Sequence, residues 1–350
     1  MKNKINLGLV GLGYWGSNYL RVLLQLNEAR LKWVCDKETN KLVDYAELTG
    51  TSAINFTEDL IKIVEDRELE AVIIATPASS HYRIAKMMLE AGKHVLVEKR
   101  LTTNYEQALE LCRSSEKMNK VLMVGHIYCF NPAVNYIKEI MKSGKLGSLY
   151  YGVGLRLGLG PIRNDASCTW DLATHDIAML DYLLNKMPSS VSANGFSFLQ
   201  KERGVHDYAT IQFNYDDGFR FNLIVSWYAA EKIRMWYLMG SKSMLKFDDI
   251  NKNAQISIFD RSVVIDFSEQ GVTKNIYKIV PRGGDTIIPY IKQEEPLLLE
   301  VKHLIECINT GKKPLTDGEQ GTRVINVLEA IEESIKKRGS PVELKERGLE

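Results

Sequence analysis

Residues 5–16 read INLGLVGLGYWG, and this stretch decides the fold of the chain around it. Its first half is a short apolar run, which is typical of a strand buried on both faces. Its second half is a glycine-rich turn of the form GxGxxG, and apolar residues with a helical period follow near 16–27. A strand, a glycine turn and a helix in this order predict the first unit of a parallel sheet.

The same alternation of apolar runs and helical segments continues to about residue 128. Further strands are predicted at 31–36, 52–56, 71–77, 94–99 and 121–128. Helical segments lie between them near 38–49, 80–91 and 103–119. Strands that are apolar on both faces and separated by helices indicate a parallel sheet covered on both sides. We therefore predict an α/β Rossmann domain over residues 1–128.

After Asn131-Pro132 the sequence predicts a helix to about Ser143 and then a different pattern. Strand-like segments separated by turn signals lie at 148–157, 191–200, 206–216, 220–230, 232–249 and 254–266. Helices are predicted at 171–184, 294–310 and 317–337. Long strands in succession favour a large open, mostly antiparallel sheet, so we predict that residues 129–350 form a second, α+β domain.

The glycine motif runs from Gly11 to Gly16 and includes Tyr14 and Trp15. In a dinucleotide site, Gly11 permits the tight turn, Gly13 lets the backbone approach a pyrophosphate, and Gly16 allows close helix packing. The helix N-terminus that follows attracts the phosphates. The alternative is an ordinary turn between a strand and a helix, but the strand before the motif and the helix after it favour a dinucleotide site.

Asp36 ends the second predicted strand, twenty residues after Gly16 (36 − 16). The dinucleotide fingerprint places an acid there that accepts hydrogen bonds from the adenosine ribose. A carboxylate at this point repels a 2′-phosphate, so we expect NAD as the cofactor rather than NADP. The neighbouring cation Lys37 would partly offset that repulsion; its alternative role is that of a solvated residue at a helix start.

Polar residues end two further strands of the predicted sheet. Thr76 and Pro77 end one, with His81 one turn into the next helix, and Glu98 and Lys99 end another. In a doubly wound sheet the ligand lies outside the carboxyl ends of the strands. We therefore expect these residues to border the cofactor. The alternative is that the charges only mark a strand leaving the core.

Asp171 and His175 lie four residues apart in the helix predicted over 171–184. At this spacing two side chains share one face of a helix. An Asp there orients the imidazole and stabilises its cationic form, which suits a general base near neutral pH. The alternative is an Asp helix cap beside a surface His, and the spacing alone favours that alternative.

The composition argues against several classes of protein. The 350 residues carry 45 Lys and Arg against 44 Asp and Glu without a long block of one sign, which disfavours nucleic acid or a membrane surface as a partner. Five cysteines without CxxC spacing argue against a disulfide framework and a zinc ribbon, and we expect no metal. No apolar run approaches the ~20 residues that cross a bilayer, and we expect no targeting segment. We expect a cytoplasmic protein that binds a small molecule.

Taken together, the motifs resemble the Gfo/Idh/MocA family of oxidoreductases. The resemblance rests on the GxGxxG with Asp36, on Glu98-Lys99 and on the Asp-x-x-x-His of 171–175, and it covers nearly the whole chain, including the ending that starts EPLLLEVKHLIECINTGKKPLTDG. It implies a nicotinamide cofactor on the Rossmann domain and a sugar or cyclic polyol against the open sheet. The second domain then binds the substrate and forms the oligomer.

The resemblance also implies the chemistry. A ring hydroxyl loses its proton to a base while its carbon gives a hydride to nicotinamide. We expect His175, oriented by Asp171, to accept the proton, and Lys99 to hold the reacting oxygen and share its negative charge. The two roles are exchangeable, and the sequence leaves that open.

The segment 156–177, RLGLGPIRNDASCTWDLATHDI, looks like family members in bacterial surface-polysaccharide and activated-sugar pathways. Arg156 and Arg163 are then candidates for contacts with a nucleotide diphosphate, because guanidinium groups suit bidentate phosphate contacts. The alternative is that one or both form salt bridges between subunits. Trp170 and His126 are further candidate substrate contacts, and the alternative for His126 is a packed residue between domains.

The leading hypothesis is an NAD-dependent dehydrogenase that acts on a nucleotide-linked sugar. The alternative among enzymes is a dehydrogenase for free myo-inositol or another cyclic polyol. The alternative from another class is a cofactor-sensing regulatory protein without catalysis. The presence of Lys99, Asp171 and His175 argues against this last alternative, because a sensor needs no proton acceptor.

Two further expectations concern the backbone and the assembly. The family usually has Glu-Lys-Pro where this chain has Glu98-Lys99-Arg100, and a cis bond before arginine would cost about 3–4 kcal/mol, so we expect a trans bond between Lys99 and Arg100. The strands FRFNLIVSWY (219–228) and RMWYLMG (234–240) would leave an apolar face on the open sheet. We therefore expect a homodimer or homotetramer assembled through these sheets.

Overall fold

The computed structural model describes residues 4–163, 166–266 and 278–345, and the chain forms two compact units. Unit 1 consists of Met1–Phe130, Glu294–Glu329 and Lys345–Glu350, and unit 2 of Asn131–Gln293 and Ala330–Leu344. The sequence analysis placed the first boundary close to the observed one but assigned everything beyond it to the second domain. The chain instead returns to unit 1, because α8 (Pro296–Thr310) packs against α1 (Tyr14–Gln25).

Unit 1 is built on a parallel sheet of six strands in the order β3-β2-β1-β4-β5-β6. The strands are β1 (Ile5–Val10), β2 (Ala29–Cys35), β3 (Asn55–Thr57), β4 (Ala71–Ile74), β5 (His94–Glu98) and β6 (Leu122–Gly125). All five pairs are parallel, which confirms the predicted Rossmann sheet. The order of strands reverses between β1 and β4, and ligands of such sheets bind beside this reversal at the carboxyl ends.

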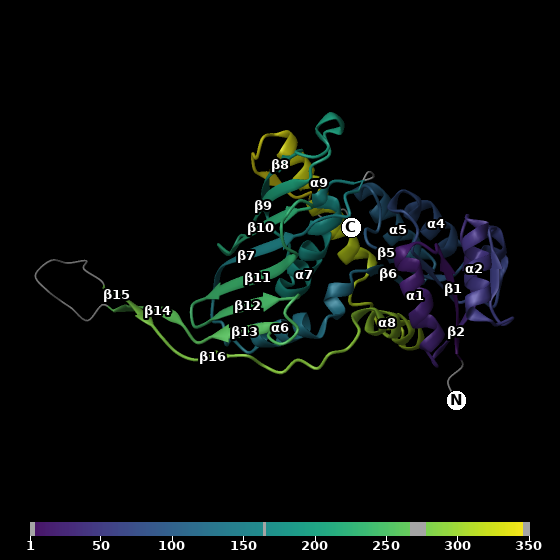
Figure 1. Cartoon of the computed structure of the whole chain (residues 1–350), viewed down its shortest axis with the longest axis horizontal. Coiled ribbons are helices and arrows are strands. Elements are labelled where there is room, and N and C mark those ends of the chain that lie inside the picture. Colours follow the sequence, from purple (N-terminus) through teal and green to yellow (C-terminus); the bar gives the residue numbers. More distant parts are fainter. Residues whose placement is uncertain (1–3, 164–165, 267–277, 346–350) are drawn as a thin grey trace, which may run out of the picture. The chain divides into compact units, whose positions relative to one another are not determined.

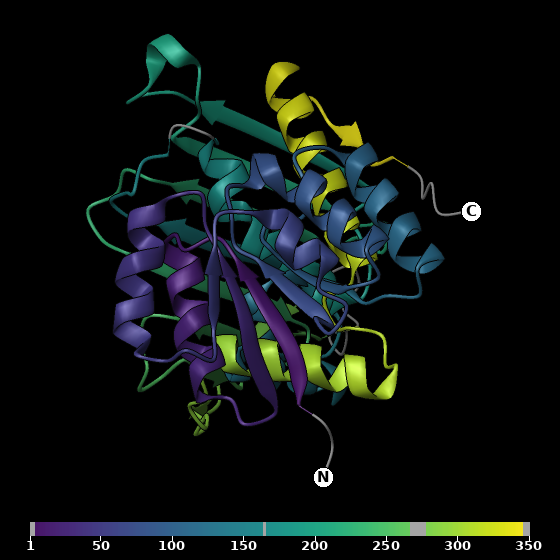
Figure 2. The ribbon, with the colours of Figure 1, turned by 90° about the vertical axis from the view of Figure 1, so that its right-hand side faces the viewer.

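Helices lie on both faces of the unit 1 sheet (Figure 2). Besides α1 and α8 they are α2 (Thr39–Thr49), α3 (Leu60–Glu65), α4 (Ala78–Glu90) and α5 (Tyr105–Lys117). The sequence analysis missed α3, because six residues are too few for a helical period. Its start is fixed locally by Asp59, which accepts a hydrogen bond from the N–H of Ile61. Helix α9 (Gly318–Lys336) contributes residues to both units.

Unit 2 is built on a sheet of nine strands in the order β16-β13-β12-β11-β7-β10-β9-β8-β17 (Figure 1). The strands are β7 (Leu149–Leu157), β8 (Ser190–Phe196), β9 (Tyr208–Asn214), β10 (Arg220–Ser226), β11 (Ile233–Gly240), β12 (Met244–Asp248), β13 (Ile256–Phe259), β16 (Thr286–Ile287) and β17 (Val342–Glu343). Only β7 and β10 pair in parallel among these strands. The predicted open, mostly antiparallel sheet is confirmed.

Two predicted strand segments are divided in the structure. Segment 232–249 forms β11 and β12 around a turn, and segment 254–266 forms β13 and β14 (Ser262–Asp266). Strand β14 pairs with β15 (Lys278–Arg282) in a separate two-stranded sheet, and the sequence analysis did not predict β15.

One face of the unit 2 sheet packs against α7 (Thr174–Leu184), which in turn packs against α6 (Pro132–Lys142). Glycines in β7 make room for the aromatic core on this face. A Cβ atom on Gly152 would lie 2.5 Å from the Phe221 ring, and one on Gly154 would lie 2.9 Å from Leu223. The space is filled by Phe221 and Trp236, whose ring centroids are 4.6 Å apart.

A buried ion pair fastens α7 to this sheet. Arg156 of β7 donates two hydrogen bonds to Asp176 of α7, and Nε1 of Trp236 donates a third to Oδ1 of Asp176 at 2.8 Å. The side chains of Arg156 and Asp176 are 5% and 1% exposed. Each charge has lost its water, so each depends on the other for compensation.

We expect Asp176→Asn to lower the free energy of unfolding by roughly 3 kcal/mol, because it leaves the Arg156 guanidinium buried without its counter-charge. Urea denaturation measures the loss. The matched control is Asp217→Asn, which breaks the exposed pair of Asp217 with Lys186 and should cost less than about 1 kcal/mol. Equal effects of the two substitutions would contradict this account of the Asp176 pair.

Candidate active site

The turn between β1 and α1 has room for glycine only at two of its three motif positions. Gly11 has φ +98°, and a Cβ atom there would lie 2.7 Å from the carbonyl oxygen of Ala75. A Cβ atom on Gly16 would lie 1.9 Å from the carbonyl oxygen of Gly11. By contrast, a Cβ atom on Gly13 would meet nothing within 4 Å. Gly11 and Gly16 therefore close the turn, while Gly13 borders open space.

The first turn of α1 is suited to an anion. Gly13 is its N-cap, no side chain caps the helix, and the first turn carries no acidic residue. Its backbone N–H groups thus keep the partial positive charge of a helix N-terminus, and Gly13 lets a phosphate approach them. The turn therefore fits the pyrophosphate of a dinucleotide. Tyr14 is exposed and Trp15 half-buried at the same helix start.

Asp36 is buried just beyond β2 and tied to the glycine turn. Its Oδ2 accepts a hydrogen bond from the N–H of Leu12 at 2.5 Å, and its Oδ1 accepts one from the N–H of Glu38 at 2.9 Å. An ionised carboxylate has about four acceptor sites, so lone pairs remain for two ribose hydroxyls. The neighbouring Lys37 is exposed, as expected of a solvated residue near a helix start.

His81 holds two strand-end loops together. Its Nε2 lies 2.7 Å from the carbonyl oxygen of Thr76, after β4, and its Nδ1 lies 2.7 Å from the carbonyl oxygen of Arg100, after β5. Burial lowers the pKa of His81, and the hydrogen bonds to the two carbonyls oppose that effect. Both ring nitrogens are therefore engaged in joining the two loops that were predicted to border the cofactor, one of which carries the exposed Pro77.

The peptide bond between Lys99 and Arg100 is cis. The sequence analysis predicted a trans bond from the general preference of residues other than proline, and that prediction is wrong. Lys99 itself is half-buried just beyond the end of β5, as expected for a side chain at a strand end.

Glu98 does not face outward at the strand end. It is buried, its Oε2 accepts a hydrogen bond from the backbone N–H of Lys99 at 2.9 Å, and its Oε1 meets the hydroxyl of Tyr19. Both side-chain oxygens of Glu98 are therefore engaged within unit 1, and its predicted contact with the cofactor stays a prediction. Sequence reasoning missed Tyr19, because a tyrosine among the apolar residues of α1 looks like ordinary core.

His126 is a packed residue of unit 1. It lies just after β6, is 1% exposed, and its Nδ1 is 2.5 Å from Oε1 of Gln320. Burial lowers the pKa of His126 to about 4, and the charge of Lys99 acts in the same direction. The ring is therefore neutral at neutral pH and donates to Gln320 through Nδ1.

The predicted pair in unit 2 lies on an irregular helix. Asp171 belongs to a π-helical turn (Thr169–Ala173), and His175 belongs to the first turn of α7. A π turn closes over one more residue than an α turn and is common at functional sites. Residues four apart still fall near one face of such a turn, so the predicted pairing of Asp171 with His175 is compatible with the helix and stays a prediction.

Asp171 is oriented by a side chain that the sequence did not point to. Nε1 of Trp227 donates a hydrogen bond to Oδ2 of Asp171 at 3.2 Å, and a guanidinium nitrogen of Arg163 lies 3.8 Å from its Oδ1. Trp227 directly follows β10, which contacts the π turn. The packing of the π turn against β10 brings Trp227 to Asp171, and no local signal announces that.

The other residues predicted to contact the substrate differ in burial and in their partners. Arg156 is buried in its ion pair with Asp176, so its guanidinium is already paired with a carboxylate instead of being open to a diphosphate. This corrects the expectation for Arg156. Arg163 is 42% exposed, and Trp170 is half-buried in the π turn.

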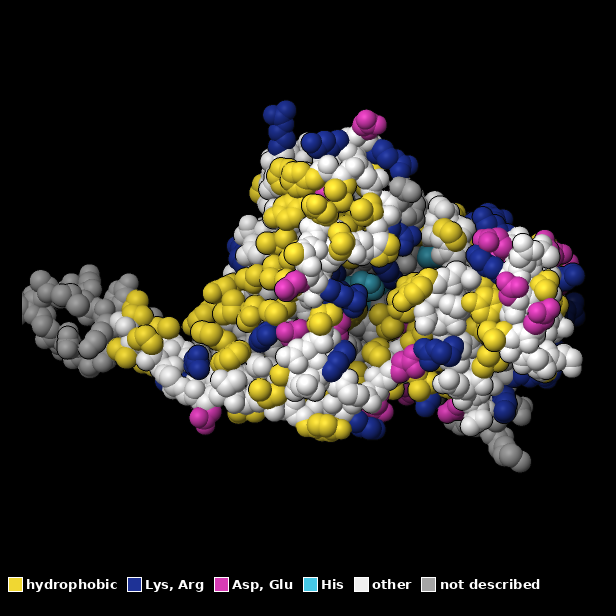
Figure 3. Space-filling model, viewed as in Figure 1, with side chains coloured by type: hydrophobic (Ala, Val, Ile, Leu, Met, Phe, Trp, Pro, Cys, Tyr) yellow, Lys and Arg dark blue, Asp and Glu magenta, His cyan; other side chains and the backbone are white. Residues whose placement is uncertain are grey.

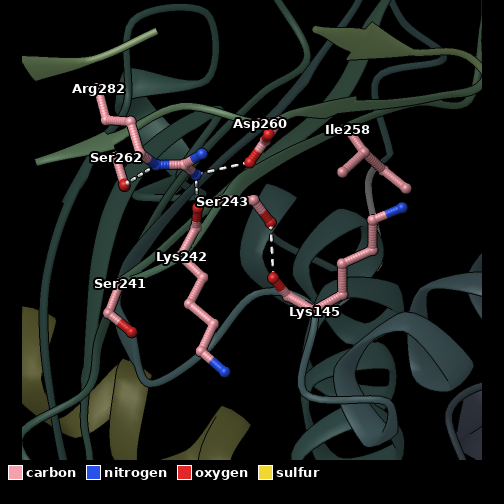
Figure 4. A pocket seen from close by; sticks show the side chains of 8 residues that line it. All are labelled: Lys145, Ser241, Lys242, Ser243, Ile258, Asp260, Ser262 and Arg282. Carbon is pink, nitrogen blue, oxygen red and sulfur yellow. Dashed lines mark hydrogen bonds and ion pairs between the residues drawn. The ribbon is translucent and has the colours of Figure 1, made fainter. Parts of the chain in front are cut away.

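A pocket of about 370 Å³ lies elsewhere in unit 2 (Figure 4). It is lined by Lys145, Ser241, Lys242, Ser243, Ile258, Asp260, Ser262 and Arg282. Arg282 is engaged there with the carbonyl of Lys242, with Asp260 and with Ser262. The amino groups of the two lysines point away from this guanidinium. We interpret the pocket as the junction that holds β15 to the turn between β11 and β12.

Among the described residues, no cluster of His, Cys, Asp and Glu has the arrangement of a metal site. In the same part of the chain, no helix combines the length and the apolar character that a membrane crossing requires.

Curated relatives are similar over almost the full chain. A UDP-N-acetylglucosamine 3-dehydrogenase from Acidithiobacillus ferrooxidans is 25% identical over 328 residues, 91% of this chain and 93% of that protein. A scyllo-inositol 2-dehydrogenase (NAD(+)) from Bacillus subtilis is 26% identical over 358 residues, 98% of this chain and 97% of that protein.

Solved structures share the fold. The UDP-N-acetylglucosamine 3-dehydrogenase from Acidithiobacillus ferrooxidans superposes with a TM-score of 0.79 at 21% identity, covering 96% of this chain and 99% of that chain. A levoglucosan dehydrogenase in complex with NADH and levoglucosan superposes with a TM-score of 0.80 at 22% identity, covering 98% of this chain and all of that chain (100%).

The sequence also matches both domains of one family. Residues 5–126 match the oxidoreductase family, NAD-binding Rossmann fold, and residues 166–344 match the oxidoreductase family, C-terminal alpha/beta domain. With the glycine turn, Asp36 and the two-unit fold in place, the chain belongs to the Gfo/Idh/MocA family of NAD-binding oxidoreductases.

Proposed function

We propose that this protein transfers a hydride between the nicotinamide of NAD and a ring hydroxyl or ketone of a nucleotide-linked sugar. The family and its relatives already make it an NAD-binding oxidoreductase of the sugar or polyol dehydrogenase type. The observation that carries the proposal is the open helix N-terminus at Gly13 with Asp36 beside it. Asp171 and His175 then supply the acid–base group for a sugar hydroxyl.

The nucleotide on the sugar is supported by two observations. One relative acts on a UDP-linked sugar, and the segment 156–177 resembles members of activated-sugar pathways. Arg163 is the cation of that segment that remains partly exposed, and a guanidinium suits a diphosphate. Because Arg156 is committed to Asp176, Arg163 is the arginine that we assign to this role.

A free cyclic polyol is the second candidate substrate. The inositol dehydrogenase from Bacillus subtilis is as similar to this chain as the UDP-sugar enzyme. The burial of Arg156 also removes one of the two cations predicted for a diphosphate. A polyol requires neither cation, so this candidate is tested beside the first.

The proposed roles follow from the settings of three side chains. NAD supplies the hydride acceptor. His175 takes the hydroxyl proton and returns it in the reverse direction, and Asp171, itself held by Trp227, stabilises the imidazolium. The ammonium group of Lys99 holds the reacting oxygen and shares its developing negative charge. The exchange of roles between Lys99 and His175 stays open, and both assignments need both groups.

We also propose the cytoplasm as the location of the enzyme. Its five cysteines are buried free thiols, which suits a reducing compartment.

The absorbance of NADH, followed with a panel of UDP-linked sugars and free polyols, tests the function. We expect turnover with a UDP-linked sugar and little with its free counterpart. Turnover with myo-inositol alone would replace the first candidate by the second. Binding of NAD without turnover of any compound would instead favour a cofactor-sensing regulator.

We expect Lys99→Ala and His175→Ala each to lower kcat by about a hundredfold or more, with little change in the Kd of NAD, because acid–base and charge stabilisation act on the reaction step. Steady-state assays of NADH absorbance measure kcat, and NAD titrations measure the Kd. Lys86→Ala, which removes a half-buried lysine of α4 paired with Glu110, is the matched control. A near-normal kcat in either variant would remove that residue from the mechanism.

We expect the wild type to bind NAD more tightly than NADP, because the Asp36 carboxylate accepts ribose hydroxyls and repels a 2′-phosphate. Asp36→Asn keeps an acceptor oxygen and removes the charge, so it should reduce the preference for NAD at least about tenfold. Fluorescence titration with both cofactors measures the ratio. The control is Asp44→Asn, at an exposed position of α2. Tighter binding of NADP by the wild type would overturn the prediction.

We propose that copies of the chain associate through the unit 2 sheet. Figure 3 shows hydrophobic side chains gathered over its strands. On the face turned away from α7, Leu155 of β7 lies between Ile224 of β10 and Met235 of β11, and all three are only half-buried. Tyr237, opposite Val153, is exposed on the same face. An apolar sheet face of this kind is typical of a symmetric interface.

We expect light scattering at micromolar concentration to give the mass of a dimer or tetramer. Tyr237→Lys, in the middle of this face, should shift the mass toward the monomer by burying a charge in the interface. Tyr45→Lys on α2 is the control. A monomeric wild type would end the proposal.

A further inference from the structure

Three buried polar side chains of unit 1 form a chain behind the strand end that carries Lys99. The hydroxyl of Tyr19, on α1, lies 3.0 Å from Oε1 of Glu98 and 2.9 Å from Oε2 of Glu300, on α8. Tyr19 and Glu300 are 0% exposed, and Glu98 is 5% exposed. The other oxygen of Glu98 accepts the backbone N–H of Lys99 at 2.9 Å. Buried carboxyl groups in contact are rare without a cation or a shared proton.

The backbone of β6 is shaped to admit this cluster. A Cβ atom on Gly125 would lie 3.2 Å from Oε1 of Glu98 and 3.2 Å from the hydroxyl of Tyr19. Any larger residue would press on both oxygens. Glycine at position 125 therefore leaves the space that the Tyr19 hydroxyl and the Glu98 carboxyl group occupy.

Counting protons fixes the ionisation of the cluster. A phenol has a single proton, and two carboxyl groups lie at hydrogen-bond distance from the same phenol oxygen. If both carboxyl groups were ionised, only one could accept that proton, and the other would face the lone pairs of Tyr19. Both contacts are hydrogen bonds only when one carboxyl is protonated and donates to the phenol.

The surroundings assign the proton to Glu300. Glu98 receives the N–H of Lys99 and lies next to the charge of Lys99, and both favour its carboxylate form. Oε1 of Glu300 is buried and has no hydrogen-bond partner among the described residues. Burial and the charge of Glu98 raise the pKa of Glu300 well above its usual range. The same burial raises the pKa of Glu98 only to about 7, because Lys99 and Tyr19 oppose it.

Other ionisable groups on the packed elements pair elsewhere. On α1, Arg21 bonds to Glu295, and on α8, His303 faces Glu306. His126, just after β6, bonds to Gln320. The charges that act on the cluster are therefore those of its own members and Lys99.

We propose that Tyr19 and Glu300 are positioning residues for Lys99: protonated Glu300 orients the Tyr19 hydroxyl toward Glu98, and the Glu98 carboxylate so held fixes the backbone N–H of Lys99. This inference rests on the proposed role of Lys99 in a dehydrogenase. In this arrangement the working form is the one with Glu98 ionised and Glu300 neutral. Neither Tyr19 nor Glu300 touches the substrate.

The arrangement predicts how turnover depends on pH. Activity needs the Glu98 carboxylate, so kcat should fall as pH drops through about 7, the pKa of Glu98. Tyr19→Phe removes a hydrogen bond that lowers this pKa, so the acid limb should move up by about one pH unit. At pH 7 that shift reduces the ionised fraction from about a half to about a tenth, a loss of about fivefold, while at pH 9 activity should return to near the wild-type value.

The kinetic experiment compares kcat between pH 6 and 9 for the wild type, Tyr19→Phe and Tyr82→Phe. Tyr82 bonds to Glu110 on a half-buried part of unit 1 away from the cluster, so its variant is the matched control and should follow the wild type. Glu300→Gln retains a donor to the Tyr19 hydroxyl and should also keep the wild-type profile. An unshifted limb in Tyr19→Phe, or an equal loss at every pH, would overturn the positioning role.

A second measurement tests whether Glu300 is protonated, and it does not require turnover of a substrate. Infrared difference spectra at pH 8 between the wild type and Glu300→Gln should show the carbonyl stretch of one protonated carboxylic acid, lost in the variant. A carboxylate band in its place would overturn the assignment to Glu300. A wild type without turnover would defeat the proposed function while leaving this spectrum meaningful, so the two failures are distinguishable.

Discussion

The close approach of α1 to β1 is the constraint on which the first unit depends. The carbonyl oxygen of Gly11 occupies the place where a side chain on residue 16 would begin, and a side chain on Gly11 would meet the carbonyl oxygen of Ala75, just beyond β4. The helix can therefore start immediately beside the sheet, with its first N–H groups facing outward past Gly13. Asp36 fastens the same turn to β2 through the N–H of Leu12. One steric condition thus produces the turn, the open helix N-terminus and the position of Asp36.

Much of this was predictable from the sequence, because it is local. The glycine spacing, the apolar runs on both sides of it and the polar residues at strand ends are short-range patterns, and they predicted the Rossmann sheet and the open antiparallel sheet. The features that the sequence did not predict depend on contacts between residues far apart in the chain. The packing of the π turn and α7 against the sheet brings Trp227 to Asp171 and Arg156 to Asp176. Likewise, the return of α8 to unit 1 depends on its packing against α1, which no local pattern announces.

Arg156 shows how a correct chemical argument fails at a buried position. A guanidinium suits a phosphate, but it suits a carboxylate in the same bidentate way. On a strand, the face that a side chain takes alternates, and the sequence alone does not say which face α7 covers. Arg156 points to the covered face, opposite Val225 of β10, and shares Asp176 with Trp236, so it serves α7. Arg163, which lies outside the strand, is then the arginine of this segment that stays a candidate for contact with a substrate diphosphate.

The two residues proposed to act on the reacting hydroxyl, Lys99 and His175, are each the sequence neighbour of a buried carboxyl group: Glu98 precedes Lys99, and Asp176 follows His175. Both carboxyl groups tie the backbone of the working residue to the core of its unit, and both must be compensated for the loss of water. Asp176 has the full charge of Arg156. Glu98 has only a phenol, one N–H and the neighbouring ammonium, so its pKa rises to about 7. The pKa of Glu98 in the folded protein then exceeds its value in the unfolded chain, so protonation of Glu98 stabilises the fold. This contribution to the free energy of unfolding is fully present below about pH 4.5 and is lost as pH rises through 7. The carboxylate that we propose to position Lys99 is thus the form that costs stability, and its hydrogen bonds come from the Tyr19 hydroxyl and the backbone N–H of Lys99.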